Sequence, residues 1–355
     1  MTCCRFRDLG FEIGLLQTGA LNAITDVAGV RVGHHTIRQG DGPDALNTGI
    51  TIILPHESDP WLERVPAAFS MLNGSGEVSG REFVEEMGLL DGPIGLTGTF
   101  NVARVADAMI TEMIARHDEI GRRGSYYHPF VAECSDALLS DLRARPIGPD
   151  EVRAAWNGAS GGPVAEGSVG GGTGTTSFEF KSGIGTSSRI AEIAGHRYTV
   201  GVLVQSNTGV RELLRINGVN VGAMISAPKP SWVAQGSIIL VVATDAPVLP
   251  RQLKRMAKRA ELGLARTGAV AVNGSGDFAL AFSTQNRSLR GQVLHTFTDI
   301  DNESISPLFQ ATAEAAEEAI LNALCAADDF YGRDGTFIPA LPLDQLKSIL
   351  ANLGR

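Results

Sequence analysis

The sequence predicts an α+β fold, in which β-sheets and helices occupy separate layers. Apolar runs typical of buried strands and segments with helical spacing are both present, but they do not alternate strictly along the chain. This order disfavours a doubly wound parallel sheet. The 355 residues are 43% hydrophobic and 19% charged, which is typical of a globular protein with ample core material. Because no linker-like segment divides them, we expect residues 1–355 to form a single domain.

Six segments predict strands, because they are apolar and bounded by glycine or polar turn residues. In chain order they are residues 24–34, 49–55, 130–132, 198–205, 237–242 and 278–284. The run that follows Ser237 is apolar at every position to Val242. This pattern favours a strand that is buried on both faces.

Apolar residues at helical spacing predict three helices, over residues 101–116, 251–266 and 306–327. The second carries a basic face opposite its apolar face, which is typical of a solvated amphipathic helix rather than a nucleic-acid arm. Asp245 and Pro247 are expected to mark a helix start. For the third helix, we expect Ser306 at the N-cap and Pro307 at the first helical position.

Residues 157–185 are rich in glycine and include the run Gly170-Gly-Gly-Thr-Gly174. The run lacks the Gly-Lys-Ser/Thr ending of a P-loop and has no clear strand-to-helix context, so nucleotide binding is disfavoured. Tight turns and close packing of the backbone explain these glycines better.

Charge and composition exclude several classes of partner. A net charge of −9 argues against a nucleic-acid partner, which would require clustered Lys and Arg. No signal-peptide core and no run of eighteen apolar residues is present, so no membrane partner is expected. Four cysteines at positions 3, 4, 134 and 325 form no disulfide framework, which fits a cytoplasmic setting. The seven histidines lack the spacing of zinc ligands, so we expect no metal and no other cofactor.

Gly236 and Ser237 stand directly before the buried strand that begins at residue 237. A turn is the ordinary explanation for such a pair. Alternatively, the chain is cut here and Ser237 becomes an N-terminal nucleophile. Glycine leaves the preceding carbonyl sterically open. A free α-amine, whose pKa is about 7.7–8.0, can act as the base for the hydroxyl of the same residue.

Other polar residues near strand ends could complete such a site, although each also has an ordinary structural explanation. They are Glu133, Ser135, Asn207, Ser275 and Asp277. Their spacing alone does not show that they converge.

Six segments of the chain carry a resemblance to a known family. They are residues 24–34 (ITDVAGVRVGH), 72–77 (LNGSGE), 167–174 (GSVGGGTG), 183–189 (GIGTSSR), 236–247 (GSIILVVATDAP) and 275–284 (SGDFALAFST). In sequence and order they resemble the self-cleaving aminopeptidases of peptidase family S58. This family includes the L-aminopeptidase D-amidase/D-esterase and the β-peptidyl aminopeptidases.

The resemblance implies a four-layer α-β-β-α sandwich of the N-terminal-nucleophile type. It implies a precursor that cuts itself between Gly236 and Ser237 into chains of residues 1–236 and 237–355. The mature protein would then be an aminopeptidase or amidase that acts on small peptides, amino-acid amides or esters through an acyl-enzyme. The resemblance further implies a homotetramer of cleaved two-chain units.

The same resemblance assigns roles to individual residues. Ser237 would be the nucleophile, with Ser275 and Asp277 relaying its proton and holding the ammonium form of its amine. Asn207 would donate to the oxyanion. Glu133 would bind the free N-terminal ammonium of the substrate, which restricts cleavage to the first residue.

Some positions depart from the family pattern. Ser135, expected to bind substrate, and Thr208 stand where relatives often carry an aromatic residue, and residues 97–101 match loosely, so substrate preference is not carried over. Three alternatives remain open. An oligoamide hydrolase of the nylon-oligomer type is disfavoured because that branch uses threonine as its nucleophile. A non-catalytic binding scaffold is disfavoured because the whole set of polar residues is present. An acetyltransferase of related fold is also conceivable.

Overall fold

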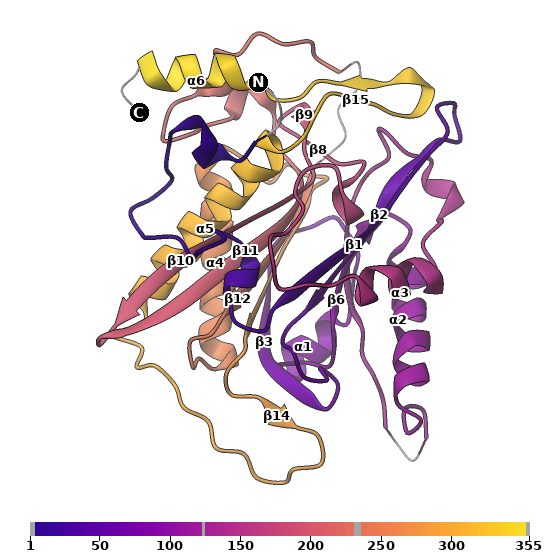
Figure 1. Cartoon of the computed structure of the whole chain (residues 1–355), viewed down its shortest axis with the longest axis vertical. Coiled ribbons are helices and arrows are strands. Elements are labelled where there is room, and N and C mark those ends of the chain that lie inside the picture. The colour runs from indigo at the N-terminus through magenta and orange to yellow at the C-terminus, as the bar shows by residue number, and fades with distance from the viewer. Residues whose placement is uncertain (1–3, 123–124, 231–235, 353–355) are drawn as a thin grey trace.

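The computed structural model describes residues 4–122, 125–230 and 236–352, and Cys3 lies outside them. Its elements stack in four layers (Figure 1). Helices α4 (Pro250–Arg266) and α5 (Ser306–Cys325) cover the outer face of one sheet. On the outer face of the other sheet lie α2 (Val102–Arg116) and α3 (Pro149–Asn157). The remaining α-helices are α1 (Arg81–Met87) and α6 (Leu343–Asn352).

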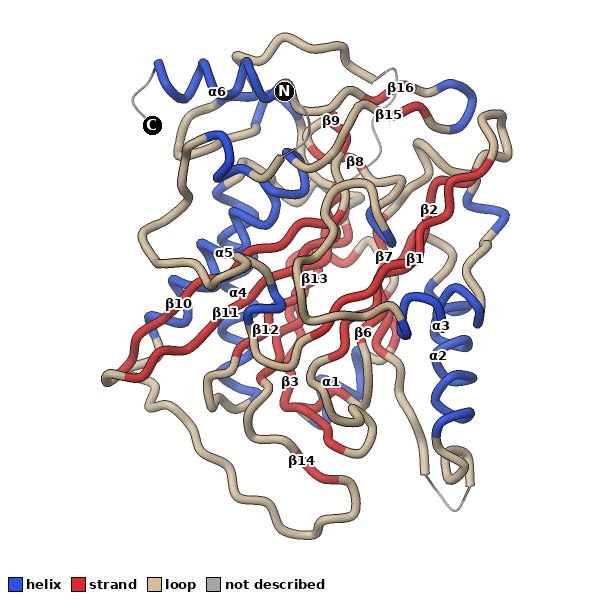
Figure 2. The backbone as a smooth tube through the Cα atoms, in the orientation of Figure 1, coloured by secondary structure: helices blue, strands red, loops and turns tan. Residues whose placement is uncertain are grey.

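Both large sheets mix parallel and antiparallel strands (Figure 2). In spatial order, the five-stranded sheet contains β1 (Arg31–Gln39), β2 (Leu46–Leu54), β6 (Ile94–Gly98), β7 (Phe130–Cys134) and β4 (Val78–Ser79). The seven-stranded sheet contains β10 (Ile184–Ile193), β11 (His196–Asn207), β12 (Ser237–Thr244), β13 (Gly276–Ser283), β3 (Glu63–Gly74) and β14 (Ser288–Leu289), with β5 (Leu89–Leu90) paired to β3. Two small hairpins are β8 (Thr176–Ser177) with β9 (Phe180–Lys181), and β15 (Phe330–Tyr331) with β16 (Phe337–Ile338).

The apolar run of β12 fills two cores at once. Ile239 and Val241 belong to the core between the two sheets, whereas Ile238, Leu240 and Val242 belong to the core beneath α4 and α5. Because side chains alternate between the faces of a strand, a strand covered on both faces must be apolar at every position.

The central strands of the seven-stranded sheet come from both sides of Gly236. The end of β11 pairs antiparallel with the start of β12, so that Asn207 lies opposite Ser237. On its other side, β12 pairs parallel with β13, and Gly276 lies opposite Ser237. Residues far apart in sequence therefore meet at the start of β12.

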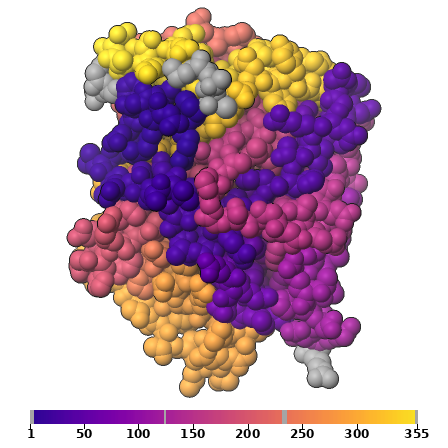
Figure 3. Space-filling view, viewed as in Figure 1, coloured from indigo at the N-terminus to yellow at the C-terminus, as the bar shows by residue number. Residues whose placement is uncertain are grey.

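In the space-filling view the N-terminal segment, in indigo, crosses the middle of one face (Figure 3).

The glycine-rich segment packs closely against the rest of the chain, as predicted. A Cβ atom at Gly171 would lie 2.6 Å from the carbonyl oxygen of Leu96, and one at Gly174 would lie 2.2 Å from the carbonyl oxygen of Asn47. Gly170, Gly171 and Gly172 form a short 3-10 turn that is fully buried.

Three sequence-based boundaries are wrong. Residues 24–26 form a 3-10 turn rather than strand, and β1 begins only at Arg31. Helix α4 begins at Pro250, since the side chain of Asp245 instead accepts a hydrogen bond from the backbone N–H of Thr199 (2.7 Å). Ser306 is already helical in α5, and Ile305 occupies the N-cap.

Candidate active site

Ser237, the first residue of β12, has two N–H groups aimed at its hydroxyl oxygen. The Nδ2 atom of Asn207 lies 3.4 Å from the Ser237 Oγ, and the backbone nitrogen of Ser135 also lies 3.4 Å from it. Both distances exceed those of a strong hydrogen bond. The serine is 5% exposed. The two donors reach it from different sheets, since Asn207 ends β11 and Ser135 follows β7.

The amide of Asn207 is fixed at its other end. Its Oδ1 atom accepts a hydrogen bond from the backbone N–H of Thr176 in β8 (3.0 Å). Because one end of the amide is held as an acceptor, the Nδ2 donor is directed toward Ser237. The residue is buried, so this orientation is protected from competing water.

Gly236 is buried against the end of β11. A Cβ atom at this position would lie 3.2 Å from both the carbonyl oxygen of Asn207 and the Cα atom of Thr208. A side chain would therefore have to displace backbone, and the absence of one lets the Gly236–Ser237 peptide lie beside Asn207.

Ser275 and Asp277 flank Gly276, the residue opposite Ser237. The Ser275 hydroxyl donates to Oδ1 of Asp277 (2.7 Å), and both side chains are buried. Among the residues that the structure describes, Oδ2 of Asp277 has no hydrogen-bond partner. Burial raises the pKa of Asp277, against a smaller lowering by the Ser275 hydroxyl. The structure brings this pair next to the start of β12 without a hydrogen bond between either side chain and Ser237.

Glu133 lies on β7, two residues before Ser135, and is 6% exposed. Its Oε2 accepts a hydrogen bond from the Thr99 hydroxyl, and its Oε1 accepts one from the backbone N–H of Glu77 (3.3 Å). Burial raises the pKa of Glu133, while these two donors lower it. A Cβ atom at Gly76 would lie 3.3 Å from both Oε1 of Glu133 and Cα of Gly276. A single glycine therefore separates this carboxyl from β13.

The neighbours of Glu133 behave differently from what their side chains suggest. Ser135 contacts Ser237 through its backbone N–H, and its own hydroxyl instead accepts from the backbone N–H of Ala137 (3.4 Å). Cys134 is fully buried, and burial raises the pKa of its thiol well above the usual range. It is therefore neutral beside Ser237. Thr208 is buried, and its backbone N–H donates to the hydroxyl of Ser177 (3.3 Å).

Sequence reasoning missed three contributors to this site. The backbone N–H of Ser135 carries no sequence signal because every non-proline residue has one. Thr99 lies in the segment 97–101, which was noted only for its loose match. The N–H of Thr176 belongs to a two-residue strand that no apolar periodicity indicates.

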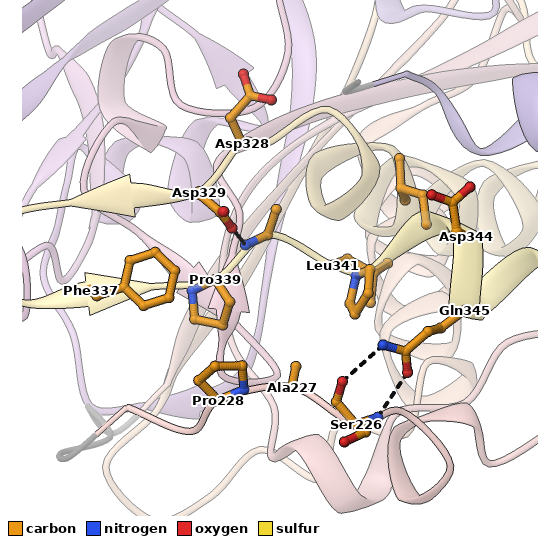
Figure 4. A pocket seen from close by; sticks show the side chains of 13 residues that line it. Ser226, Ala227, Pro228, Asp328, Asp329, Phe337, Pro339, Leu341, Asp344 and Gln345 are labelled. Atoms are coloured by element: carbon orange, nitrogen blue, oxygen red, sulfur yellow. Dashed lines mark hydrogen bonds between the residues drawn. The ribbon is translucent and has the colours of Figure 1, made fainter. Parts of the chain in front are cut away.

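A separate pocket of about 710 Å³ lies elsewhere on the molecule (Figure 4). It is lined by residues 226–228, 328–329, 337 and 339–345, none of which is a candidate site residue. The side-chain amide of Gln345 closes one end by two hydrogen bonds to the backbone of Ser226 (3.0 and 2.9 Å). In the described part of the chain, no group of three His, Cys, Asp or Glu side chains is placed to hold a metal ion.

Comparison with known proteins decides the family. The sequence profile described as Peptidase family S58 matches residues 22–338. The chain belongs to this family. It is 44% identical over 367 residues to the β-peptidyl aminopeptidase BapA of Sphingosinicella xenopeptidilytica, an alignment that covers 98% of this chain and 90% of the relative.

Two solved structures share the complete fold. A β-aminopeptidase from Burkholderia sp. superposes with a TM-score of 0.93 at 42% identity, with 99% of both chains covered. The L-aminopeptidase D-Ala-esterase/amidase of Ochrobactrum anthropi, described as a variant of the Ntn hydrolase fold, has a TM-score of 0.93 at 37% identity and 99% coverage of both chains.

These findings confirm the expected family, the four-layer N-terminal-nucleophile fold and the general function. This S58 member is a peptide-bond hydrolase.

No helix within the described ranges is both long and apolar enough to cross a membrane.

Proposed function

We propose that this chain is a self-processing serine aminopeptidase that cuts its own Gly236–Ser237 peptide bond and then removes N-terminal residues from small substrates. The observation that carries the proposal is the position of Ser237. Its hydroxyl follows a buried glycine, and the N–H groups of Asn207 and Ser135 are both 3.4 Å from it. When this hydroxyl attacks a carbonyl, the negative charge develops on the carbonyl oxygen, which is then bonded to the same carbon as the Ser237 Oγ. Donors beside the Oγ are therefore within reach of the developing oxyanion, which they would stabilise.

The self-cleavage step is an N-to-O acyl shift. The Ser237 Oγ attacks the Gly236 carbonyl carbon, the bond from that carbon to the Ser237 nitrogen breaks, and the hydroxyl proton passes to the nitrogen. The resulting ester is hydrolysed by water, which leaves a carboxylate on Gly236 and a free α-amine on Ser237. The products are the chains 1–236 and 237–355.

In the mature enzyme the same hydroxyl attacks the substrate. The freed α-amine, with an ordinary pKa of about 7.7–8.0, accepts the hydroxyl proton and later gives it to the leaving amine. Asn207 and the Ser135 N–H hold the oxyanion. One such donor is worth about 3–4 kcal/mol of transition-state stabilisation.

Ser275 and Asp277 hold the new amine in this proposal. Oδ2 of Asp277 has no hydrogen-bond partner among the described residues, which supports the role, because buried polar atoms in folded proteins are generally hydrogen-bonded. Self-cleavage creates such a donor on Ser237, the residue opposite Gly276.

Glu133 binds the N-terminal ammonium of the substrate. Within the described residues no Lys or Arg forms an ion pair with this buried carboxyl, so a cation from outside can satisfy it. A charge-assisted hydrogen bond contributes about 1.5–3 kcal/mol. This is enough to favour a free first residue over an internal peptide bond.

The names of the relatives support the proposed substrate class. Their names include a β-peptidyl aminopeptidase at 44% identity and an L-aminopeptidase with D-Ala-esterase/amidase activity at 37%. We therefore assign short peptides, amides or esters with a free N-terminal amine, β-amino acids among them. A cytoplasmic homotetramer of cleaved two-chain units is part of the proposal.

The proposal is tested by measuring the intact mass and the N-terminal sequences of the purified protein under denaturing conditions. We expect two chains, the smaller beginning Ser-Ile-Ile-Leu. The cleaved protein should then release p-nitroaniline from at least one of the L-alanine, D-alanine and β-alanine p-nitroanilides. A chain that stays whole on incubation would overturn the self-processing mechanism.

A further inference from the structure

Lys181 carries a fully buried side-chain amine at the end of β9. Among the described residues no carboxylate forms an ion pair with it. Its Nζ donates instead to three backbone carbonyl oxygens, those of Thr175 (2.8 Å), Ser182 (2.5 Å) and Gly172 (3.5 Å). Burial lowers the pKa of this amine well below its usual range. A buried amine without a counter-ion depends on such hydrogen bonds to offset the loss of its hydration.

An aromatic ring and a second basic side chain also lie close to Lys181. The ring of Phe330 lies 5.1 Å from Nζ, and the guanidinium of Arg38 stacks on the same ring at 4.9 Å. Arg38 further lowers the pKa of the lysine. The hydrogen-bond donors of Lys181 are thus directed onto backbone carbonyls.

One of these carbonyls leads directly to the candidate active site. The carbonyl of Thr175 and the N–H of Thr176 are the two ends of a single peptide group. Lys181 donates to the first end, and the second end donates to Oδ1 of Asn207 (3.0 Å). The other end of the Asn207 amide then points its Nδ2 at the Ser237 hydroxyl.

We propose that Lys181 is a positioning residue that aligns the Asn207 amide with the reacting oxygen through the Thr175–Thr176 peptide group. Hydrogen bonds in a chain polarise one another, so a donor on the carbonyl strengthens the N–H at the far end of the same group. The effect fixes both the location and the orientation of Asn207. Lys181 touches neither the substrate nor Ser237, and it acts in both self-cleavage and turnover. The inference rests on the function proposed above.

A double-mutant cycle tests the relay, with Lys181→Met, Asn207→Ala and the double variant compared in kcat and KM on the p-nitroanilide that the wild type hydrolyses. We expect Lys181→Met to lower kcat by about 10- to 100-fold, with KM changed less than about twofold. In the Asn207→Ala background, Lys181→Met should cost less than about threefold more, because the group it aligns is gone. If a variant matures too slowly for kcat to be measured, all four proteins of the cycle are compared by the first-order rate constant of self-cleavage instead.

Thr173→Val is the matched control. The Thr173 hydroxyl donates to the carbonyl of Gly170 in the same glycine-rich segment, so its loss loosens this segment without touching the relay. We expect it to change kcat less than about threefold and to combine additively with Asn207→Ala. If Lys181→Met does not fold, as judged by its thermal melting, Lys181→Gln carries the same cycle.

The outcomes separate the two proposals. If the decreases in kcat caused by the Lys181 and Asn207 substitutions are additive, or if Lys181→Met raises KM without lowering kcat, then Lys181 only holds the fold. Either result would overturn this inference while the proposed function stands. A wild-type chain that neither cuts itself nor hydrolyses any of the p-nitroanilides would overturn the function, and the relay with it.

Discussion

Asn207 lies directly opposite Ser237 across β11 and β12, and its Nδ2 atom is 3.4 Å from the Ser237 Oγ. The backbone N–H of Ser135 reaches the same oxygen from the other sheet. The candidate site therefore lies where the two sheets face each other at their strand ends. Packing of the sheets fixes the distance between the donors, which is the kind of preorganisation that oxyanion stabilisation requires.

Ser237→Ala is expected to remain a single chain and to hydrolyse nothing, because one hydroxyl performs both reactions. Ser237→Cys keeps a nucleophile at the same place and should still cut itself, at a changed rate. Intact mass after prolonged incubation distinguishes the variants. Two fragments from Ser237→Ala would place the attacking group elsewhere.

Asn207→Asp separates the donor function of Asn207 from its structural hydrogen bond. The aspartate retains an oxygen that can accept from the Thr176 N–H, but it loses the Nδ2 donor. We expect kcat to fall about 10²- to 10³-fold, as for the loss of one oxyanion donor. Steady-state kinetics on the mature enzyme measure this. Near-normal kcat in Asn207→Asp would mean that the side chain serves only to hold β8.

Glu133→Gln should raise KM for substrates with a free amine while leaving amine-blocked esters almost unchanged. With a contribution of about 1.5–3 kcal/mol, the increase is about 10- to 100-fold. Equal losses on both substrate types would contradict the ammonium-binding role.

The pH dependence of KM provides a second test of Glu133. Burial raises the pKa of this carboxyl, and the ionised form is the one that attracts an ammonium. As the pH falls through that raised pKa, the carboxylate is lost and KM for free-amine substrates should rise. Glu133→Gln should abolish this rise. A wild-type KM that is flat over the acid range would show that Glu133 is ionised throughout.

The sequence singled out the polar side chains of the candidate site, which are those of Ser237, Asn207, Glu133, Ser275 and Asp277. The structure places Asn207, Ser275 and Asp277 beside the start of β12 and Glu133 on the facing sheet, and their chemical roles stay predictions. The relay through Thr175 and the N–H of Ser135 use backbone atoms, which are the same in every sequence. Only the folded chain shows where such groups point.

The strand expected over residues 24–34 is wrong in its first part for a local reason. The carboxylate of Asp26 accepts hydrogen bonds from the backbone N–H groups of Leu21 and Ala23 and from the hydroxyl of Ser188. An aspartate that binds nearby backbone N–H groups in this way favours a turn over an extended strand. The apolar pattern around it reflects burial in the core between the sheets, to which Ile24 and Val27 both contribute.

Asp136 gives a prediction for stability that is independent of catalysis. This residue is 1% exposed, and neither carboxyl oxygen has a hydrogen-bond partner within the described ranges. Burial raises its pKa to about 7, although the nearby Thr48 hydroxyl opposes the shift. Between about pH 4 and 7 the native carboxyl therefore keeps a proton that the unfolded chain has already lost.

The sign of the effect follows from proton linkage. Because the native state binds more protons in this window, the free energy of unfolding falls as pH rises, with a slope for this group of up to about 1.4 kcal/mol per pH unit. Above the native pKa the contribution becomes constant. Asp136→Asn keeps the shape of the side chain and cannot ionise, so its stability relative to the parent should rise from pH 4.5 to 7 and then level off.

Urea unfolding at several pH values measures this difference, with Ser237→Ala as the parent so that the chain remains whole. Asp328→Asn, which makes the same substitution at an exposed aspartate, is the control. A difference for Asp136→Asn that does not vary with pH would mean that its carboxyl is ionised in the native protein. The ionised carboxyl of Asp136 would then require a buried hydrogen-bond donor, because burying an unpaired carboxylate would destabilise the native state by more than its free energy of unfolding.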